Sequence, residues 1–320
     1  MFLRRAILGA LLFSMVSSGA FADLNAAFVE EPVTIRIAPK TVVSAPIHVL
    51  SLAVGGPAPA IVAPRLTVHV GEGAEVTIIE TFAGTGNGAA TLTTALTGFT
   101  IDPAAVVHHV KFQCESTAAF HMAGISARLG RASTLVSHAL TFGGRISRND
   151  ITTVLDGEGA ECTLDGLYVA DADALVDTHT TIDHAKPHWP SHEHYKGILA
   201  GRAKAVFNGK IIVRQDAQKT DAKQTNRALL LSDAAQVNTK PQLEIFADDV
   251  KCTHGAAIGQ LDDDAMFYLQ ARGISQIDAR NILIHAFAAE VLDTIATPAV
   301  KARALHLMEA KLSLAEASLA

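Results

Sequence analysis

The sequence feature that most constrains the fold is a repeated rhythm of short β-branched runs and small-residue turns, which extends from about residue 33 to residue 259. Runs such as Leu-Thr-Val-His-Val at 66–70 alternate with a period of two, which is typical of strands with one buried face. The turn Gly-Glu-Gly-Ala-Glu occurs twice, at 71–75 and 157–161, and each copy joins one β run to the next. This part of the chain is therefore predicted to be built from stacked, similar units.

Stacked units of this kind predict a mainly β fold with a right-handed parallel β-helix (β-solenoid) as its core. No helical pattern interrupts the strands, so each coil leaves a face that only the next coil can bury. A β-sandwich has the same coarse pattern and stays open as the alternative. Hydrophobic residues make up 49% of the chain but aromatic residues only 5%. The core must therefore come from Ala, Val, Ile and Leu, as suits stacked coils.

After the β region the pattern becomes helical. We expect a first helix over 262–272, with acidic residues in its first turn and Gly273 directly after its end. Ser275 and Asp278 have the spacing of a capping box and predict the start of a second helix. Thr-Pro at 297–298 suits the start of a third helix that ends near residue 319. These helices predict a small C-terminal α-helical domain.

The N-terminus has the pattern of a secretory signal peptide. Arg4 and Arg5 precede an apolar run over 6–16, and Ala-Phe-Ala at 20–22 has the form of a cleavage site before Asp23. The run is too short to span a membrane, and no later stretch is long and uncharged enough, so we expect no membrane partner. The predicted division is a signal-like or displaced segment at 1–22, a β-helix core domain at 23–259 and a helical domain at 260–320.

Charge and missing motifs exclude several function classes. The formal net charge is −6, so no basic field indicates a nucleic-acid partner. The basic residues Lys196, Arg202, Lys204 and Lys210 fit the solvated face of a sheet. Phosphate-loop, G-x-S-x-G and H-E-x-x-H motifs are all absent from the sequence. We therefore expect a chain that is not an enzyme and has no nucleotide site of its own.

The densest cluster of metal-ligand residue types is a run of histidines. Five imidazoles in so short a stretch could form a metal site, but Pro187 and Pro190 indicate an irregular loop and no carboxylate completes a three-residue ligand set. The alternative is that these histidines hydrogen-bond between neighbouring coils. The run consists of His179, His184, His188, His192 and His194, of which the last four are the weaker metal candidates.

A second cluster combines a thiol with an imidazole. The cysteines at 114, 162 and 252 lie too far apart for a disulfide framework or a self-contained zinc or ferredoxin-type site. On a strand, Cys252 and His254 project from the same face. Together they make half of a soft-metal site, which suits a site shared across a subunit interface. The alternative is a small buried cysteine beside a histidine that bonds between coils.

Ordered sequence blocks over most of the chain resemble the SufB/SufD family of the SUF iron–sulfur cluster assembly system. They include Val-Phe-Asn-Gly-Lys-Ile at 206–211 and Ala-Asp-Asp-Val-Lys-Cys-Thr-His-Gly at 247–255, and the resemblance spans about residues 21 to 295. Cys-Thr-His-Gly at 252–255 is similar to the Cys-Ser-His-Gly element on the SufD side of the family. The other blocks lie at 195–197, 217–222, 226, 229–232, 240–245, 267–269 and 272–275.

The resemblance implies a non-catalytic scaffold subunit. It implies pairing with SufB, or with a second copy of this chain, through the β-helix, and docking of the SufC ATPase on the C-terminal helices. A transient iron–sulfur cluster or iron would be shared with SufB, with His254 as ligand and Cys252 beside it. Family members carry a helical region ahead of the β-helix, and we expect a truncated or displaced start in this chain. The resemblance implies a cytoplasmic protein, with export as the alternative.

A different class stays open beside this one. The signal-like N-terminus would suit a secreted β-helical protein that acts on polysaccharide or binds metal through its histidines. Such polysaccharide sites need clustered carboxylates, and Asp171, Asp173 and Asp177 are the clustered candidates in the β region.

Overall fold

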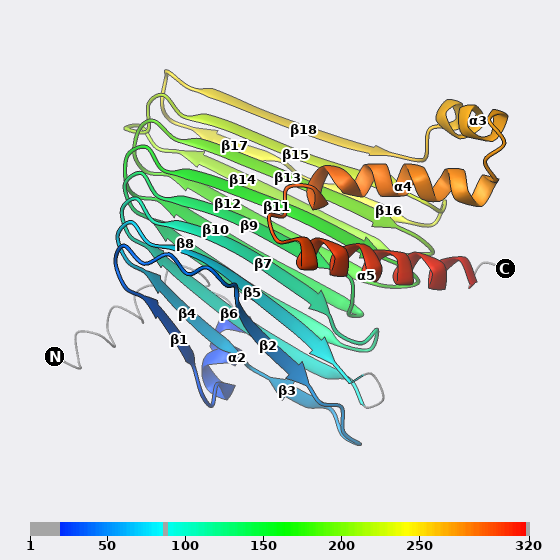
Figure 1. The fold of residues 1–320 in the computed structure, drawn as a ribbon, viewed down its shortest axis with the longest axis horizontal. Coiled ribbons are helices and arrows are strands. Elements are labelled where there is room, and N and C mark those ends of the chain that lie inside the picture. The colour runs from blue at the N-terminus through cyan, green and yellow to red at the C-terminus, as the bar shows by residue number, and fades with distance from the viewer. Residues whose placement is uncertain (1–19, 86–88, 318–320) are drawn as a thin grey trace.

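The computed structural model describes residues 20–85 and 89–317. Two long parallel sheets face each other, and the chain passes from one to the other in every coil (Figure 1). One sheet has the order β1-β4-β6-β8-β10-β12-β14-β16, in which β3 also pairs with β6 and β17 with β14. The other has the order β18-β15-β13-β11-β9-β7-β5-β2. The predicted parallel β-helix is confirmed, and the β-sandwich alternative is wrong because every strand pair is parallel rather than antiparallel.

The strands and helices follow the predicted rhythm closely. In chain order they are α2 (Ala20–Phe28), β1 (Val33–Ile37), β2 (Ile47–Ala53), β3 (Ala60–Val62), β4 (Arg65–Val70), β5 (Glu75–Gly84), β6 (Thr91–Ile101), β7 (Val106–Cys114), β8 (Phe120–Leu129), β9 (Thr134–Thr141), β10 (Ile146–Leu155), β11 (Glu161–Ala170), β12 (Leu175–His184), β13 (Pro190–Leu199), β14 (Lys204–Val213), β15 (Asp221–Leu230), β16 (Gln236–Thr239), β17 (Gln242–Ile245), β18 (Lys251–Gly259), α3 (Asp263–Ala271), α4 (Gln276–Leu292) and α5 (Pro298–Ala317).

The repeated Gly-Glu-Gly-Ala-Glu turn sits where neighbouring coils touch. A Cβ on Gly71 would lie 2.6 Å from the backbone nitrogen of Pro39, and one on Gly157 would lie 2.1 Å from that of Arg131. The second glycine of each copy, Gly73 or Gly159, has a positive φ, which glycine adopts without strain. Both glycines of the motif are therefore required, one by close approach and the other by backbone conformation.

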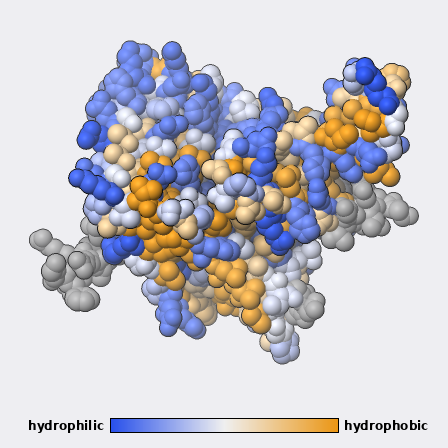
Figure 2. Space-filling view, viewed as in Figure 1, coloured by the Kyte–Doolittle hydropathy of each residue, from blue (hydrophilic) through white to orange (hydrophobic). Residues whose placement is uncertain are grey.

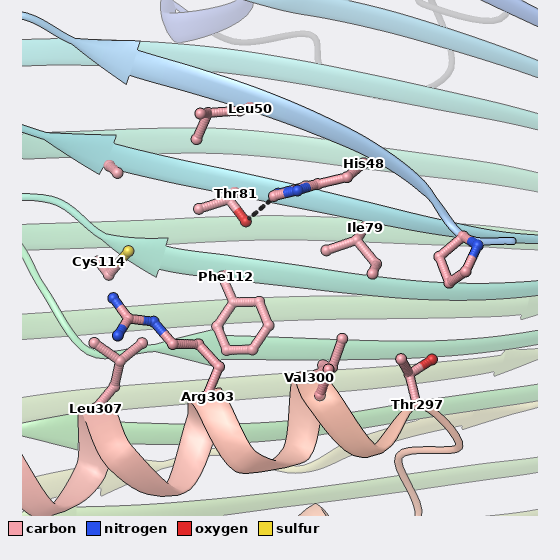
Figure 3. A pocket seen from close by; sticks show the side chains of 13 residues that line it. His48, Leu50, Ile79, Thr81, Phe112, Cys114, Thr297, Val300, Arg303 and Leu307 are labelled. Atoms are coloured by element: carbon pink, nitrogen blue, oxygen red, sulfur yellow. Dashed lines mark hydrogen bonds between the residues drawn. The ribbon is translucent and has the colours of Figure 1, made fainter.

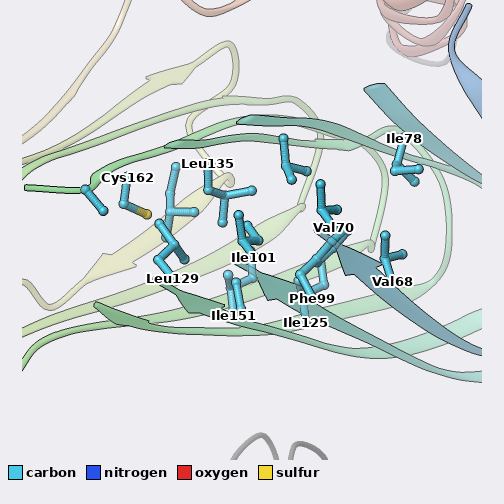
Figure 4. Packing of buried hydrophobic residues seen from close by; sticks show 14 of the residues in the cluster. Val68, Val70, Ile78, Phe99, Ile101, Ile125, Leu129, Leu135, Ile151 and Cys162 are labelled. Atoms are coloured by element: carbon cyan, nitrogen blue, oxygen red, sulfur yellow. The ribbon is translucent and has the colours of Figure 1, made fainter. Parts of the chain in front are cut away.

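The core lies between the two sheets and consists mainly of aliphatic side chains. Val68, Ile101, Ile125 and Ile151 are almost completely buried there (Figure 4). Burying one such side chain contributes on the order of 1.5–3 kcal/mol. Stacking of equivalent positions from coil to coil gives a continuous core without many aromatic rings, as the composition predicts.

The C-terminal helices begin where the sequence predicts. Asp262 caps α3 by accepting from the backbone of Ala265, and Gly273 follows it with a positive φ. Ser275 caps α4 by accepting from the backbone of Asp278. The third helix, α5, begins at Pro298, and its predicted end near residue 319 lies outside the described residues. The proposed division of the chain into domains stays a prediction.

Two of these helices, α4 and α5, lie along the outer face of the 8-stranded sheet (Figure 1). Polar contacts join them to it as well. The ammonium of Lys196 is buried and donates to the backbone oxygen of Phe287 (2.8 Å) and to Glu290 (2.7 Å). The expectation that Lys196 is solvated is therefore wrong, because a helix about ninety residues later covers its strand face. The shared apolar cluster includes Phe112, Leu140, Val169 and Ile198 from the strands and Ile284, Val291, Ala304 and Met308 from the helices.

The described part of the N-terminus adds a helix that the sequence rhythm did not predict. Asn25 of α2 is buried and donates to the backbone oxygens of Thr94 and Pro64, which ties the helix to the 10-stranded sheet. Most of the signal-like segment, residues 1–19, lies outside the described residues. Among the helices that the structure describes, none combines the length and apolar character needed to cross a membrane.

Candidate functional site

Cys252 and His254 lie on β18, the last strand of the 8-stranded sheet. They pair in register with Ala222 and Gln224 of β15, whose side chains point into the solenoid. Both candidate residues therefore face the lumen side of the final coil. Because β18 is the end strand of this sheet in the described part of the chain, His254 is exposed and Cys252 is half-buried.

The surroundings of the thiol are apolar. Cys252 packs against a small cluster that includes Val213 and Ala222. Burial raises the pKa of the Cys252 thiol, and the carboxylate of Asp221 adds to that effect. The thiolate that binds iron or zinc therefore forms readily only when a cation approaches. The thiol and the imidazole lie on one face of β18, and their role as half of a ligand set stays a prediction.

The end of the solenoid around this site is open. One edge of β18 has no partner strand in the described part of the chain, and such an edge is a template for pairing with another chain. Hydrophobic side chains are also exposed nearby, at Phe246 and Ile258, and on α3 at Phe267 and Tyr268. Figure 2 shows a hydrophobic patch around α3 and another over the first strands of the solenoid.

The histidine run is distributed over the fold and does not converge. His184 is buried and bonds Ser191 Oγ (3.0 Å), whereas His192 and His194 lie on the outer face of β13. His188 occupies a turn with φ 65°, and the irregular region is shorter than expected because β13 begins at Pro190. Within the described residues no group of three or more His, Cys, Asp or Glu side chains is arranged to hold a metal.

The clustered aspartates are held in ion pairs. Asp171 contacts Lys311 (2.7 Å), Asp173 contacts Arg202 (2.7 Å), and Asp177 pairs with Arg148. These carboxylates tie coils and helices together. The geometry thus gives no support to a pair of free catalytic carboxylates at these positions.

The lumen holds a polar network that the sequence analysis missed. Glu80 accepts from Thr97 Oγ1 (2.9 Å) and from His109 Nε2 (3.0 Å). Lys111 donates to Asn149, and burial lowers the pKa of this ammonium to about 8. The signal was available in the period of two, because Glu80 shares the inward face of β5 with Val76 and Ile78.

A second carboxylate of this network is Glu115. Its oxygens accept from Thr93 and Gln113 and lie 2.8 Å from His121 Nδ1. Burial acts to raise the pKa of Glu115, but His121 and the hydrogen bonds outweigh it and hold the pKa below its usual value. In this first half of the lumen, the buried carboxylates of Glu80 and Glu115 are therefore matched by hydrogen-bond donors and by the ammonium of Lys111.

A groove of about 600 Å³ lies beside α5, on the outer side of β2, β5 and β7 (Figure 3). Its walls are mainly apolar, with Ile79, Phe112 and Val300 among them, and Arg303 extends toward Cys114. His48 of β2 bonds Thr81 of the neighbouring strand β5 (2.8 Å). The groove belongs to strands at the beginning of the solenoid, whereas Cys252 and His254 lie on its last strand.

The fold is thus a parallel β-solenoid that carries a half-buried thiol and an exposed imidazole on its end strand. Comparison with known proteins identifies the family. Residues 53–287 match the family model described as SUF system FeS cluster assembly, SufBD core domain. The chain therefore belongs to the SufBD family.

Individual relatives agree with this placement. The iron–sulfur cluster assembly protein SufD of Escherichia coli is 40% identical over 243 residues, which cover 75% of this chain and 57% of that protein. An iron–sulfur cluster assembly SufBD family protein of Synechocystis is 36% identical over 290 residues, covering 88% of this chain and 64% of the relative. The chain thus spans about three fifths of the length of these relatives, and the similarity supports a SufD-type subunit.

Proposed function

We propose that this chain is a non-catalytic scaffold subunit of the SUF iron–sulfur cluster assembly complex. The observation that carries the proposal is the pair Cys252 and His254 on the open end strand of a SufBD-family solenoid. Relatives named as iron–sulfur cluster assembly proteins support the same role. The sequence has no phosphate-loop motif, so the ATPase activity would come from a partner.

The unpaired edge of β18 is the proposed contact with SufB. A partner strand there would extend the 8-stranded sheet and bring a second set of ligands against Cys252 and His254. Imidazole and thiolate are suitable ligands for iron or an iron–sulfur cluster. A transient cluster or iron would be shared across this interface, and the isolated chain would bind it weakly.

The exposed side chains of α3 and the start of α4 are the proposed docking surface for the SufC ATPase. Phe267 is 73% exposed, Tyr268 56% and Ile277 63%. Large exposed apolar side chains on one small element are typical of protein interfaces. Because α4 is anchored to β13 through Lys196, a movement of the docked ATPase would be transmitted to the solenoid. A cytoplasmic location is part of this proposal, since its partners work there.

The ligand role is tested by measuring cluster yield on the assembled complex of this chain with SufB and SufC. We expect His254→Ala to lower the yield about tenfold, by analogy with the loss of groups that support metal ligands, while the complex still forms. His192→Ala is the matched control, because His192 lies on the outer face of β13. Cluster yield of His254→Ala equal to that of the control would reject the ligand role.

The docking surface is tested by co-purification. Phe267→Asp and Tyr268→Asp place charges on the proposed interface without touching the solenoid core, so SufC binding should be lost while the fold is retained. Retained SufC binding by both variants would move the docking surface elsewhere. Failure of the unmodified chain to co-purify with either SufB or SufC would reject the scaffold proposal as a whole.

A further inference from the structure

A column of side chains inside the solenoid leads to His254. Leu164, Glu193, Gln224 and His254 occupy equivalent positions on β11, β13, β15 and β18, each in register with the next. In-register neighbours of a parallel sheet lie about 4.8 Å apart and point to the same side. The last three members of this column are polar, although the first two of them are buried in the core.

The carboxylate in this column has no cation beside it. Glu193 is 2% exposed, and among the described residues it takes part in no ion pair. Burial raises the pKa of Glu193 to about 7. An uncompensated buried carboxylate is destabilising, and such groups are concentrated at functional sites.

Gln224 is oriented by that carboxylate. Its Nε2 donates to Glu193 Oε2 (2.6 Å), and its Oε1 is buried without a partner. The amide also fills the space above Gly209 of the opposite sheet, where a Cβ would lie 2.2 Å from Nε2. Because the donor end of the amide is used by Glu193, the acceptor end is left free.

The next coil places His254 in register with Gln224. We infer that Glu193 and Gln224 are positioning residues for His254, with Gln224 Oε1 accepting a hydrogen bond from one imidazole N–H. The imidazole is exposed, so a rotation of its side chain makes this bond at small cost. The bond fixes one tautomer of the imidazole. The other ring nitrogen is then unprotonated and points toward the open end, where it can coordinate a metal.

This inference deepens the proposed function and rests on it for what His254 then binds. The positioning itself is a property of the free chain. It makes Glu193 and Gln224 parts of the site although neither is close to the surface. A residue that only filled the core could be replaced by an apolar side chain of similar shape without any effect on the imidazole.

The tautomer of His254 is measured by ¹⁵N NMR of the ring nitrogens in the free, complete chain, with assignment by His254→Ala. One tautomer should dominate in the unmodified chain. Gln224→Leu should return the ring to the mixture of a free imidazole, and Glu193→Leu should do so in part, because the amide is then free to flip. Glu193→Gln should preserve the tautomer, since an amide oxygen still accepts from Gln224 Nε2.

Asn226→Leu is the matched control. Asn226 is also buried on β15, but its column ends at Ala256 and contains no imidazole on β18. The amide spectra of each variant establish that the fold is retained. An unchanged tautomer in a folded Gln224→Leu chain overturns the inference, as does a free-imidazole mixture in the unmodified chain.

The same set of variants separates this inference from the function on which it rests. A fixed tautomer together with undiminished cluster yield in His254→Ala would support the positioning role and reject the ligand role. Loss of cluster yield in His254→Ala, with no effect of Gln224→Leu on either tautomer or yield, would support the ligand role and reject the positioning role.

Discussion

The carboxylates inside the two halves of the solenoid are all buried, but they differ in the cations and hydrogen-bond donors around them. In the first half, Glu80 and Glu115 each have several hydrogen-bond donors, and the ammonium of Lys111 lies close enough to act on both. In the second half, Glu193 accepts from the amide of Gln224 and has no ion-pair partner within the part of the chain that the structure describes. Unpartnered polar atoms occur in both halves, for example Thr94 Oγ1 and Gln224 Oε1, so the difference lies in how the buried carboxylates are compensated.

This difference in compensation indicates which part of a repetitive fold is functional. A compensated network is costly to break but need not do anything beyond holding coils together. An uncompensated carboxylate lowers stability and persists only where something else requires it. The uncompensated half is also the half that ends in Cys252 and His254, so the electrostatic difference and the candidate site coincide.

The largest expected effect is in the compensated half. Lys111→Met keeps the length and apolar stem of the side chain but removes the cation that acts on Glu80 and Glu115. Leaving buried carboxylates uncompensated costs about 3–5 kcal/mol of unfolding free energy. Urea unfolding measures the loss. Lys210→Met, which removes a half-exposed partner of Glu244, should cost about 1 kcal/mol or less, and an equal effect of the two changes would contradict the comparison.

The second expected effect is a gain in stability, on replacing the uncompensated carboxylate of Glu193. Burial raises the pKa of Glu193 from its ordinary value of 4.5 to about 7 in the folded chain, so the unfolded chain releases this proton at lower pH. Stability contributed by the protonated carboxyl is complete below about pH 4.5 and is lost as pH rises to about 7. The accumulated loss is on the order of 3 kcal/mol. Glu193→Gln should therefore be more stable than the unmodified chain by up to that amount above pH 7.

Unfolding curves at several pH values test this claim. The difference between Glu193→Gln and the unmodified chain should grow between about pH 4.5 and pH 7 and then level off. Glu161→Gln is the control, because Glu161 is exposed at the start of β11, and it should change stability by less than about 0.5 kcal/mol. A constant difference across that range would show that Glu193 does not titrate as described.

The sequence predicts much of this architecture because its signals are local. Alternation at β4 and β10, the glycines at 71 and 157, and the cap at Ser275 each depend on a few neighbouring residues. The strand that holds Cys252 and His254 could be predicted for the same reason.

What could not be predicted depends on pairing across long sequence separations. Lys196 looks solvated by alternation, but α4 covers it. The histidine run looks like a metal site by density, yet its members are divided between two sheets. The column from Glu193 to His254 becomes visible only when the register of three coils is known. Alternation within β5 and β13 does place Glu80 and Glu193 on the inward face.

The smallest expected effect is a difference in stability between removing a lumen hydroxyl that has a hydrogen-bond partner and removing one that has none. Ser137 Oγ lies 2.9 Å from His109 Nδ1, whereas the buried Oγ of Ser147 has no partner among the described residues. Ser137→Ala leaves a buried ring nitrogen unsatisfied and should cost about 1–2 kcal/mol. Ser147→Ala removes an unsatisfied hydroxyl and should be neutral, or stabilising by about 0.5 kcal/mol.

Thermal or urea unfolding of the two alanine variants, measured side by side, checks this prediction. The two substitutions remove the same atom from equally buried serines, so hydrophobic and volume terms cancel in the comparison. A larger loss for Ser147→Ala than for Ser137→Ala would mean that its hydroxyl binds an internal water, since a bridging water makes such a group as valuable as a direct partner. The unpaired polar atoms of the lumen would then mark a hydrated interior, and the contrast between its halves would be one of water content rather than of compensation.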